Sequence, residues 1–321
     1  MVQLKKRKNT NNLPDFVMSK IEKIENYHPN GMLSEKGVLK DGKVFGEWIY
    51  CYKSGEKHRV INFDKDGKSL NIIKWYKNGQ KKLEGNNYKE GIETEWYENG
   101  QKKLESSIKN TKIHGKRIKW YETGEKKYER NFVDGFLNGK QIYYFISGKV
   151  HEIRFCKDGK QDGKWIIYYE NGQKESEVIL KDNREDGLCT FWYENGQIKE
   201  ESIWVDGKRE GKWVNWYNNG EKKGECYYKD DKREGKYFLY FKSGQIDESG
   251  FYKNDKRNGN GVRFYENGQK MTEGKCKDDL TDGFQTVWDE SGKIIWEGDF
   301  KMGEVEDDEG FPIHLFEEPS D

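Results

Sequence analysis

The sequence predicts an all-β fold, an elongated and twisted antiparallel meander of about twelve β-hairpin repeats of 24 residues. Three observations predict it. A short aromatic string that contains a glycine recurs along the chain, the glycines of this string keep a constant spacing, and a second glycine-rich turn lies between successive copies. Self-similarity at a fixed period of about 20–50 residues is the sequence signature of a repeat architecture.

The recurring string consists of two aromatic residues, a variable residue, Asn or Ser, Gly, and Gln or Glu, as in Trp75 to Gln80. We call its glycine the main-turn glycine and count positions in each repeat from it. Successive main-turn glycines are 24 residues apart, except for one step of 21 between Gly79 and Gly100. They are Gly31, Gly55, Gly79, Gly100, Gly124, Gly148, Gly172, Gly196, Gly220, Gly244, Gly268 and Gly292. The shorter step falls in the loop at Tyr88–Gly91, where a deletion leaves the strand register unchanged.

A second turn lies between the main turns, with the pattern Lys-Asp-Gly-Lys-x-x-Gly in Lys40 to Gly46 and Lys157 to Gly163. Asn-Gly and Asp-Gly suit a tight hairpin because glycine has no Cβ, and Asn and Asp tolerate the left-handed region of backbone conformation. Two turns in 24 residues leave room for two short strands. Each repeat is therefore predicted to be one hairpin.

Three sets of side chains are expected to form one apolar core face. They stand four residues before the main-turn glycine (Trp192), six before it (Thr190) and eight after it (Trp204), with similar residues in the other repeats. A second aromatic stripe, three residues before the glycine, is expected on the opposite face. Its tyrosines include Tyr76, Tyr97, Tyr121, Tyr169, Tyr193, Tyr217 and Tyr265. Glu five residues after the glycine and nearby Lys are expected to pair across strands on solvated surface.

Composition narrows the classes of protein to consider. The chain has 36% charged and 33% hydrophobic residues, but its 15% aromatic content argues against disorder. Lys plus Arg and Asp plus Glu are 58 each, so no nucleic-acid partner is expected, and anionic membrane lipid is disfavoured. The sequence shows no apolar run long enough for a signal peptide or membrane span, and its five cysteines have no metal-ligand spacing. A cytoplasmic protein with reduced thiols is expected.

The chain is expected to have three parts. Residues 1–26 form a polar, basic arm or a short capping helix, because Phe16, Val17, Ile21 and Ile24 have helical spacing. Residues 27–300 form the repeat array. Residues 301–321 form an acidic tail or cap, either a frayed solvated end or an acidic mimic that occupies a basic site of a partner.

The repeats resemble the MORN repeat, through strings such as Tyr-Glu-Asn-Gly followed by Lys-Asp-Gly-Lys-x-x-Gly. They depart from it where Trp or Tyr stands two residues after the last glycine, mostly as Lys-Trp or Lys-Tyr, at Trp48, Trp165, Trp213 and Tyr237. This makes them more similar to the bacterial MORN-variant proteins often catalogued as antitoxin components of toxin–antitoxin systems. The resemblance covers about residues 27 to 300. It implies an elongated, twisted antiparallel sheet of stacked hairpins.

The sequence predicts no catalytic, cofactor-binding or metal-ligating residues. Asp64 to Gly67 has the start of a calcium loop, but the bidentate Glu of such a loop is absent, and a hairpin turn explains the string better. The repeats fill nearly the whole chain. The chain is therefore expected to be non-enzymatic.

The leading functional hypothesis is a protein-binding scaffold, an antitoxin or immunity-like inhibitor that binds a toxin or effector through its aromatic and charged surface. The tyrosines three residues before the main-turn glycine are the candidate contacts, because tyrosine is enriched in binding hot spots. Stacking of both aromatic stripes on their neighbours as core is the competing interpretation. The alternative functions are a membrane- or phosphoinositide-associated scaffold, with the lysine pairs at 102–103, 126–127 and 222–223 as a basic ladder, and a passive structural spacer.

Overall fold

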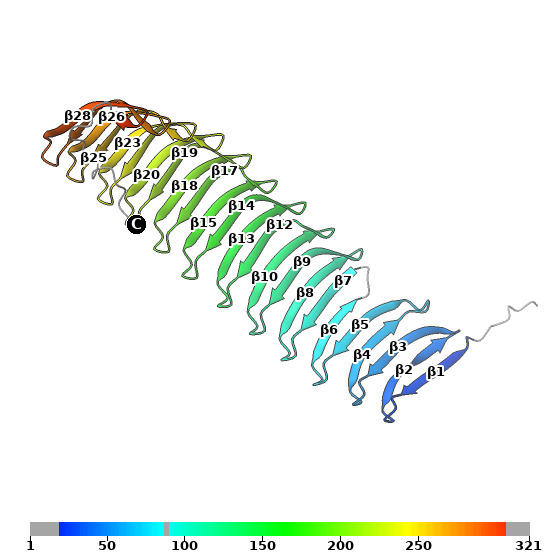
Figure 1. The fold of residues 1–321 in the computed structure, drawn as a ribbon. Coiled ribbons are helices and arrows are strands. Elements are labelled where there is room, and N and C mark those ends of the chain that lie inside the picture. The colour runs from blue at the N-terminus through cyan, green and yellow to red at the C-terminus, as the bar shows by residue number, and fades with distance from the viewer. Residues whose placement is uncertain (1–18, 87–89, 306–321) are drawn as a thin grey trace, which may run out of the picture. The chain divides into compact units, whose positions relative to one another are not determined.

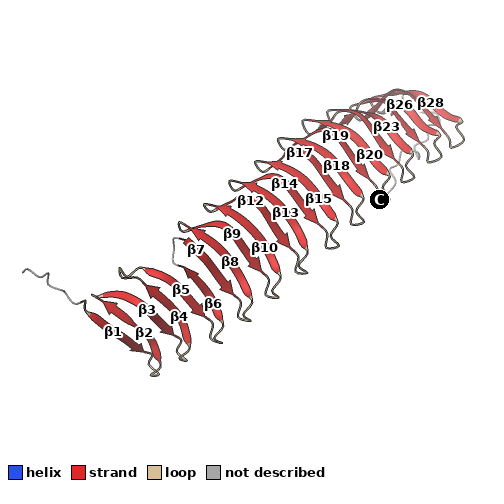
Figure 2. Ribbon diagram, turned by 180° about the vertical axis from the view of Figure 1, so that it is seen from behind, coloured by secondary structure: helices blue, strands red, loops and turns tan. Residues whose placement is uncertain are grey.

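The computed structural model describes residues 19–86 and 90–305, which fall into two compact units. Unit 1 comprises the chain up to Lys112 together with Glu122–Gly124, and unit 2 comprises Ile113–Tyr121 and the chain from Glu125 onward. Every regular element in these residues is a β-strand (Figure 2), so the predicted all-β class is confirmed. No helix in the described ranges is long and apolar enough to cross a membrane.

In unit 1, each strand pairs antiparallel with the next strand along the chain (Figure 1). The strands are β1 (Ile21–Tyr27), β2 (Leu33–Lys40), β3 (Lys43–Cys51), β4 (Lys57–Phe63), β5 (Ser69–Trp75), β6 (Lys81–Asn86), β7 (Glu90–Trp96) and β8 (Lys102–Lys109).

Unit 2 is likewise an antiparallel meander in a single layer of strands. Its strands are β9 (Lys112–Trp120), β10 (Lys126–Val133), β11 (Phe136–Leu137), β12 (Gly139–Tyr144), β13 (Val150–Lys157), β14 (Lys160–Tyr168), β15 (Lys174–Lys181), β16 (Arg184–Glu185), β17 (Gly187–Trp192), β18 (Ile198–Val205), β19 (Lys208–Trp216), β20 (Lys222–Lys229), β21 (Lys232–Arg233), β22 (Gly235–Tyr240), β23 (Ile246–Lys253), β24 (Lys256–Arg257), β25 (Gly259–Phe264), β26 (Lys270–Lys277), β27 (Leu280–Trp288), β28 (Ile294–Lys301) and β29 (Glu304–Val305). The predicted repeated hairpin is confirmed in both units.

In most of the described repeats the second turn has two successive residues with positive φ, whereas the turn between β4 and β5 has one, Gly67. Asp206 and Gly207 have φ of 50° and 81°, and Asp230 and Asp231 have φ of 49° and 68°. Two positive values in a two-residue loop are the mark of a type I′ turn, whose twist matches that of the flanking strands. Aspartate and asparagine tolerate this conformation better than most other residues with a Cβ, which explains why the position is Asp, Asn or Gly in most repeats.

The main turn is closed by the backbone and by its asparagine. In one repeat, the N–H of Tyr193 donates to the carbonyl of Gln197 (2.8 Å), and the N–H of Gly196 donates back to the carbonyl of Tyr193 (2.9 Å). Asn195 accepts the N–H of Gln197 through Oδ1 (3.0 Å). Its Nδ2 donates to the carbonyl of Asn218 in the next repeat (2.8 Å). The Asn of the recurring string therefore both shapes its own turn and ties it to the next.

The predicted core face is wrong in one respect. Ile166, six residues before a main-turn glycine, pairs with Glu177, whereas Leu180, eight residues after it, pairs with Gly163. Side chains alternate along a strand, so Ile166 and Leu180 lie on opposite faces of the sheet. The cause is a register shift between Ile167 and Tyr168 that leaves Glu175 as an extra residue in the turn. One extra residue moves everything after it to the other face.

The most buried side chains lie on one face of the sheet. Val178, Leu180 and Cys189 form a buried cluster, and the half-buried rings of Trp165 and Trp204 pack against it. Near the end of unit 2, the buried residues Val287, Trp296 and Phe300 form a second such cluster. Aromatic rings cover small side chains in both places, so a lean sequence builds its core mainly from rings.

The ends of the array differ from the expected boundaries. Ile21 and Ile24 lie in strand β1 and not in a helix, because β1 pairs with β2 along its whole length, from Ile21 opposite Lys40 to Tyr27 opposite Leu33. The first part of the predicted capping helix, residues 15–18, lies outside the described residues. The same holds for the acidic tail after Val305.

Candidate binding face

One face of the sheet carries a Lys–Glu pair in several repeats, and we call it the regular face. Its centre is the residue five after the main-turn glycine, which is Glu in eight repeats. Glu177 pairs with Lys174 (2.5 Å) and with Lys164 on the neighbouring strand (2.6 Å). Hydrogen bonds from Lys164 and then Lys174 hold the pKa of Glu177 below its ordinary value. Equivalent Lys–Glu pairs are 81–84, 102–105, 126–129, 222–225 and 270–273.

The lysines of these pairs also lie over aromatic rings. The ammonium of Lys174 is 5.2 Å from the ring centre of Trp192, which stands four residues before the next main-turn glycine. The same contact joins Lys81 to Trp96 and Lys270 to Trp288. Each solvated pair or cation–π contact contributes less than about 1 kcal/mol to stability.

The opposite face changes from repeat to repeat, and we call it the variable face. Before the main-turn glycine, this face carries the residues at positions eleven, seven and five. After the glycine, it carries the residues at positions four, six and eight. In unit 2 the residues seven before the glycine are Arg117, Gln141, Trp165, Cys189, Trp213, Tyr237, Gly261 and Gln285. Their neighbours six before it are Ile118, Ile142, Ile166, Thr190, Val214, Phe238, Val262 and Thr286. The residues seven before the glycine differ more in size and polarity than those six before it, so we take the variable face as the candidate binding surface.

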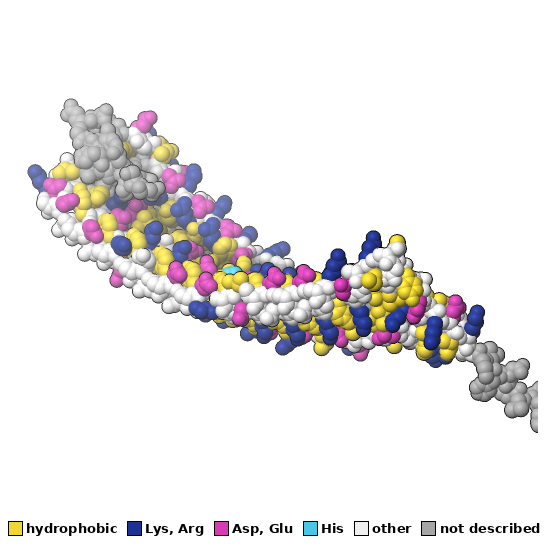
Figure 3. All heavy atoms as spheres, turned by 90° about the horizontal axis from the view of Figure 1, so that it is seen from below, with side chains coloured by type: hydrophobic (Ala, Val, Ile, Leu, Met, Phe, Trp, Pro, Cys, Tyr) yellow, Lys and Arg dark blue, Asp and Glu magenta, His cyan; other side chains and the backbone are white. Residues whose placement is uncertain are grey.

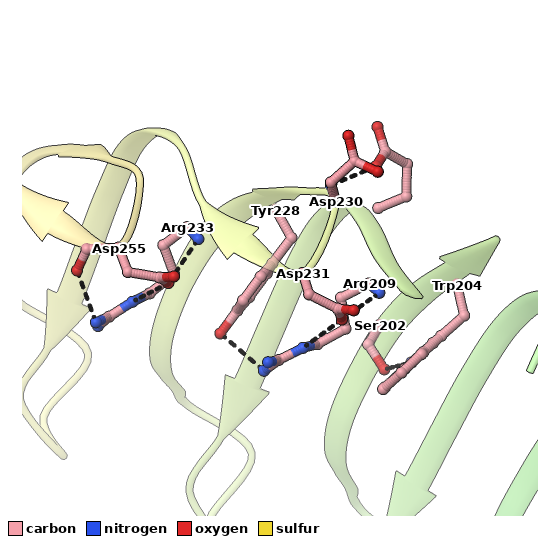
Figure 4. Close-up of polar contacts among 9 residues, drawn as sticks. Ser202, Trp204, Arg209, Tyr228, Asp230, Asp231, Arg233 and Asp255 are labelled. Atoms are coloured by element: carbon pink, nitrogen blue, oxygen red, sulfur yellow. Dashed lines mark hydrogen bonds and ion pairs between the residues drawn. The ribbon is translucent and has the colours of Figure 1, made fainter. Parts of the chain in front are cut away.

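A ladder of arginine and aromatic side chains runs along the variable face of unit 2 beside the second turns (Figure 4). The guanidinium carbon of Arg209 lies 4.2 Å from the ring centre of Tyr228, and Nη1 donates to the tyrosine hydroxyl (3.1 Å). Trp204 lies on its other side, with 6.0 Å between ring centre and guanidinium. One repeat later, Arg233 lies 4.1 Å from the ring of Tyr252.

Aspartates at the second turns hold these arginines in place. Asp231 accepts the backbone N–H of Arg209 (2.8 Å), and its Oδ1 lies 3.6 Å from Nε of the same arginine. Asp255 does the same for Arg233, at 2.8 Å and 3.4 Å (Figure 4). The backbone N–H of Arg233 is the largest cause that lowers the pKa of Asp255. An aspartate in the left-handed region therefore orients an arginine of the preceding repeat.

The ladder borders a hollow of about 240 Å³, with Trp213, Arg233 and Tyr237 among its lining residues. Glu248, which is buried, accepts the hydroxyl of Tyr237 and lies 3.4 Å from Nη2 of Arg257. Burial, followed by the bond to Glu248, raises the pKa of the Tyr237 hydroxyl. This polar network is satisfied internally, so it fixes the rings that line the hollow.

A second arginine–aromatic cluster lies earlier in unit 2. Arg130 lies 4.1 Å from the ring centre of Tyr128 and 5.1 Å from that of Tyr143. Arg154 lies 5.1 Å from Tyr143 and 5.3 Å from Trp165. The variable face thus presents stacked arginines and rings in two places. On the surface in view in Figure 3, hydrophobic, basic and acidic side chains interleave.

The tyrosines predicted as contacts link successive repeats. Their hydroxyls donate to the carbonyl four residues before the next main-turn glycine. These bonds are Tyr76 to Trp96 (2.9 Å), Tyr121 to Tyr144 (3.1 Å), Tyr169 to Trp192 (2.9 Å), Tyr193 to Trp216 (2.7 Å), Tyr217 to Tyr240 (2.9 Å) and Tyr265 to Trp288 (2.9 Å). Tyr97 has Lys103 over its ring at 6.0 Å. All seven side chains are half-buried, and the hydroxyls that form these six bonds link one repeat to the next.

The arginine ladder was missed from the sequence, although a signal for it exists. Arg209 and Arg233 belong to the Lys-Arg-Glu-Gly strings of the second turns, which were interpreted only as turns. Each of these arginines stands eleven residues before a main-turn glycine. In the strand pair, this position lies opposite the aromatic residue that stands eight residues after the preceding main-turn glycine, as Arg209 lies opposite Trp204.

The cysteine thiols are buried or half-buried and form no metal site in the described residues. Cys189 and Cys226 are free and buried, and burial raises the pKa of each thiol to about 11. Among the residues that the structure describes, no group of three or more His, Cys, Asp or Glu side chains could hold a metal ion.

Comparison with known proteins agrees with the turn chemistry. The model of the MORN repeat variant matches six segments, residues 89–110, 113–134, 161–182, 185–206, 209–230 and 233–254. No curated protein matches the chain. The fold and its two turns define a tandem β-hairpin repeat protein. With six matched segments, the chain belongs to the MORN-variant repeat family.

Solved structures add little to this. The chain is similar to a crystal structure of TcdB2-TccC3, with 9% identity over 89% of this chain and 17% of that one, at a TM-score of 0.20. It is also similar to the Photorhabdus luminescens Tc holotoxin pore, with 9% identity over 87% of this chain and 17% of that one, at a TM-score of 0.17. The chain spans about 17% of the length of both. Similarity at TM-scores this low does not indicate a function for the chain.

Proposed function

We propose that this protein is a non-enzymatic, cytoplasmic scaffold that binds a partner protein through the variable face of unit 2. The observation that carries the proposal is the arginine–aromatic ladder of Arg209, Tyr228, Arg233 and Tyr252. Trp, Tyr and Arg are the residue types that dominate binding hot spots. Asp231 and Asp255 hold the arginines before any partner arrives, which lowers the entropy cost of binding.

The partner we propose is a toxin or effector protein that the scaffold inhibits by occupying its surface. This part of the proposal rests on the resemblance to MORN-variant proteins catalogued as antitoxins. It requires that the partner be harmful when produced alone and harmless when produced together with this chain. A passive spacer would lack such an effect.

Paired variants test which face binds. Arg233→Gln and Tyr252→Ala change the variable face, and Lys174→Gln changes the regular face of the same unit by one charge. Proteins that co-purify with the wild type from the native cell are quantified against each variant, with thermal unfolding as the check on folding. We expect binding to fall at least tenfold in the variable-face variants, since hot-spot truncations cost about 2 kcal/mol or more. Equal loss in Lys174→Gln would count against the proposal.

The alternative of a membrane scaffold finds little support in the lysine pairs. Lys102 pairs with Glu105 (2.7 Å) and Lys222 with Glu225 (2.9 Å), both on the regular face. Lys103 instead pairs with Glu95 (3.3 Å), and Lys223 lies 5.8 Å from the ring of Tyr217. The two lysines of a pair therefore have different partners, and those on the regular face are neutralised. Flotation with phosphoinositide vesicles at low salt distinguishes this alternative.

A further inference from the structure

A pocket on the variable face of unit 1 is lined mainly by positive charge. It has a volume of about 220 Å³ and is lined by His58, Arg59, Lys74, Lys82, Leu83 and Glu95. Arg59, Lys74, Leu83 and Glu95 occupy one row across strands β4 to β7, because each pairs directly with the next. Lys82 and His58 border the row.

The cations of this pocket lack acidic partners. Within the described part of the chain, Arg59, Lys74 and Lys82 form no ion pair, and Glu95 is engaged with Lys103 at 3.3 Å. Arg59 and Lys74 lie directly opposite each other, an arrangement that destabilises a strand pair. Arg209 and Arg233 of unit 2 differ, since Asp231 and Asp255 lie beside them.

Arg59 is held in place by a ring and leaves a donor unused. Its guanidinium carbon lies 4.1 Å from the ring centre of Tyr50. Its buried Nε has no hydrogen-bond partner in the described structure. A buried donor without a partner costs free energy.

His58 reports the positive potential of the pocket. Its ring packs on Tyr52, with 4.6 Å between ring centres. Burial is the largest cause that lowers the pKa of His58, followed by the charges of Arg59, Lys82 and Lys74. All three cations are therefore close enough to act on a group at the pocket.

We propose that this pocket is a binding site for a phosphate-class oxyanion, held by Arg59, Lys74 and Lys82. A single carboxylate would neutralise only one of the three cations. A phosphoryl group carries about −1.5 to −2 charge at pH 7 and offers three acceptor oxygens, which suits one guanidinium and two ammonium groups. A volume of about 220 Å³ exceeds what one water needs many times over, so it admits such a group with solvent.

The pKa of His58 in the full chain measures occupancy. It is followed by NMR, with chloride and inorganic phosphate compared at equal ionic strength, and the His58 signal is assigned with His58→Gln. An anion in the pocket offsets the positive potential, so the pKa of His58 is expected to rise as phosphate is added. No difference between chloride and phosphate would overturn the proposal.

Charge variants on one strand locate the site. Lys82→Gln is expected to weaken phosphate binding about tenfold, the loss of one charge-assisted hydrogen bond. Lys81→Gln is the matched control, because Lys81 has the same charge but pairs with Glu84 (2.8 Å) on the regular face. Glu95→Gln removes the acid of the pocket and is expected to tighten binding. Equal weakening by Lys81→Gln and Lys82→Gln, or weaker binding by Glu95→Gln, would overturn the proposal.

The source of the oxyanion is distinguished by a second ligand. A phosphoserine peptide that binds at least tenfold more tightly than inorganic phosphate assigns a phosphorylated protein to the site. Equal affinities assign a free anion. For either assignment, binding must be weakened by Lys82→Gln and unchanged by Lys81→Gln. The test does not depend on partner binding by unit 2, so either proposal can fail alone.

Discussion

The hydroxyl of Tyr193 offers the sharpest test of how the repeats hold together. It donates to the carbonyl of Trp216 in the next repeat at 2.7 Å, and the tyrosine ring is half-buried. Tyr193→Phe keeps the ring, and with it the contact to Lys199 at 5.8 Å, but removes the hydroxyl. The carbonyl of Trp216 then loses this donor.

A typical intramolecular hydrogen bond contributes about 0.5–1.5 kcal/mol to stability, so Tyr193→Phe is expected to lower the free energy of unfolding by about 1 kcal/mol. Urea unfolding followed by tryptophan fluorescence measures this as a lower midpoint at unchanged slope. Changing Tyr169, Tyr193 and Tyr217 together is expected to cost about three times as much, because the three bonds have separate acceptors.

Tyr227→Phe is the matched control, since Tyr227 is 45% exposed on the regular face of the same unit. It is expected to leave the midpoint unchanged. If Tyr193→Phe behaves like Tyr227→Phe, the hydroxyl does not link the repeats, and the tyrosines become candidates for partner contact again. A stable Tyr193→Phe variant that fails to bind partner would refute the structural role directly.

Three further predictions follow from the turns, the regular face and the thiols. Asp231→Ala is expected to destabilise the chain more than Asp231→Gly, by about 1 kcal/mol in thermal unfolding, because φ at this residue is 68° and glycine adopts that region freely; equal effects would show that the lost bond to Arg209 dominates. The pKa of Glu177 is lowered in the folded state, so its contribution is present above the ordinary value of 4.5 and lost as the pH falls through the folded pKa; unfolding between pH 5 and about 3 should therefore depend less on pH in Glu177→Gln than in the wild type. Cys189 and Cys226, whose thiol pKa is raised to about 11, are expected to resist alkylation at pH 8 until the chain unfolds; mass spectrometry that finds rapid labelling of the native protein would contradict this.

The sequence by itself determined the repeat, its period and its two turns. These features depend on local chemistry: glycine, Asn and Asp adopt positive φ where other residues resist it, so the turns are visible in the order of residues. The expected pairing of Lys with Glu across strands occurs at Lys164 and Glu177 and at Lys212 and Glu225. The pair of Lys174 with Glu177 lies along one strand instead.

Only the tertiary structure decided which face each later residue joins. The extra residue at the main turn, Glu175 in one repeat, reverses the alternation, and the sequence alone does not show where such a residue falls. It moved Leu180 away from Ile166 and onto the variable face. The arginine ladder and the cationic pocket depend on the same step, since they join residues from neighbouring strands. The alternation of residues in the sequence shows which side chains of one strand share a face. Which of these faces joins a given face of the next strand depends on the register across the turn.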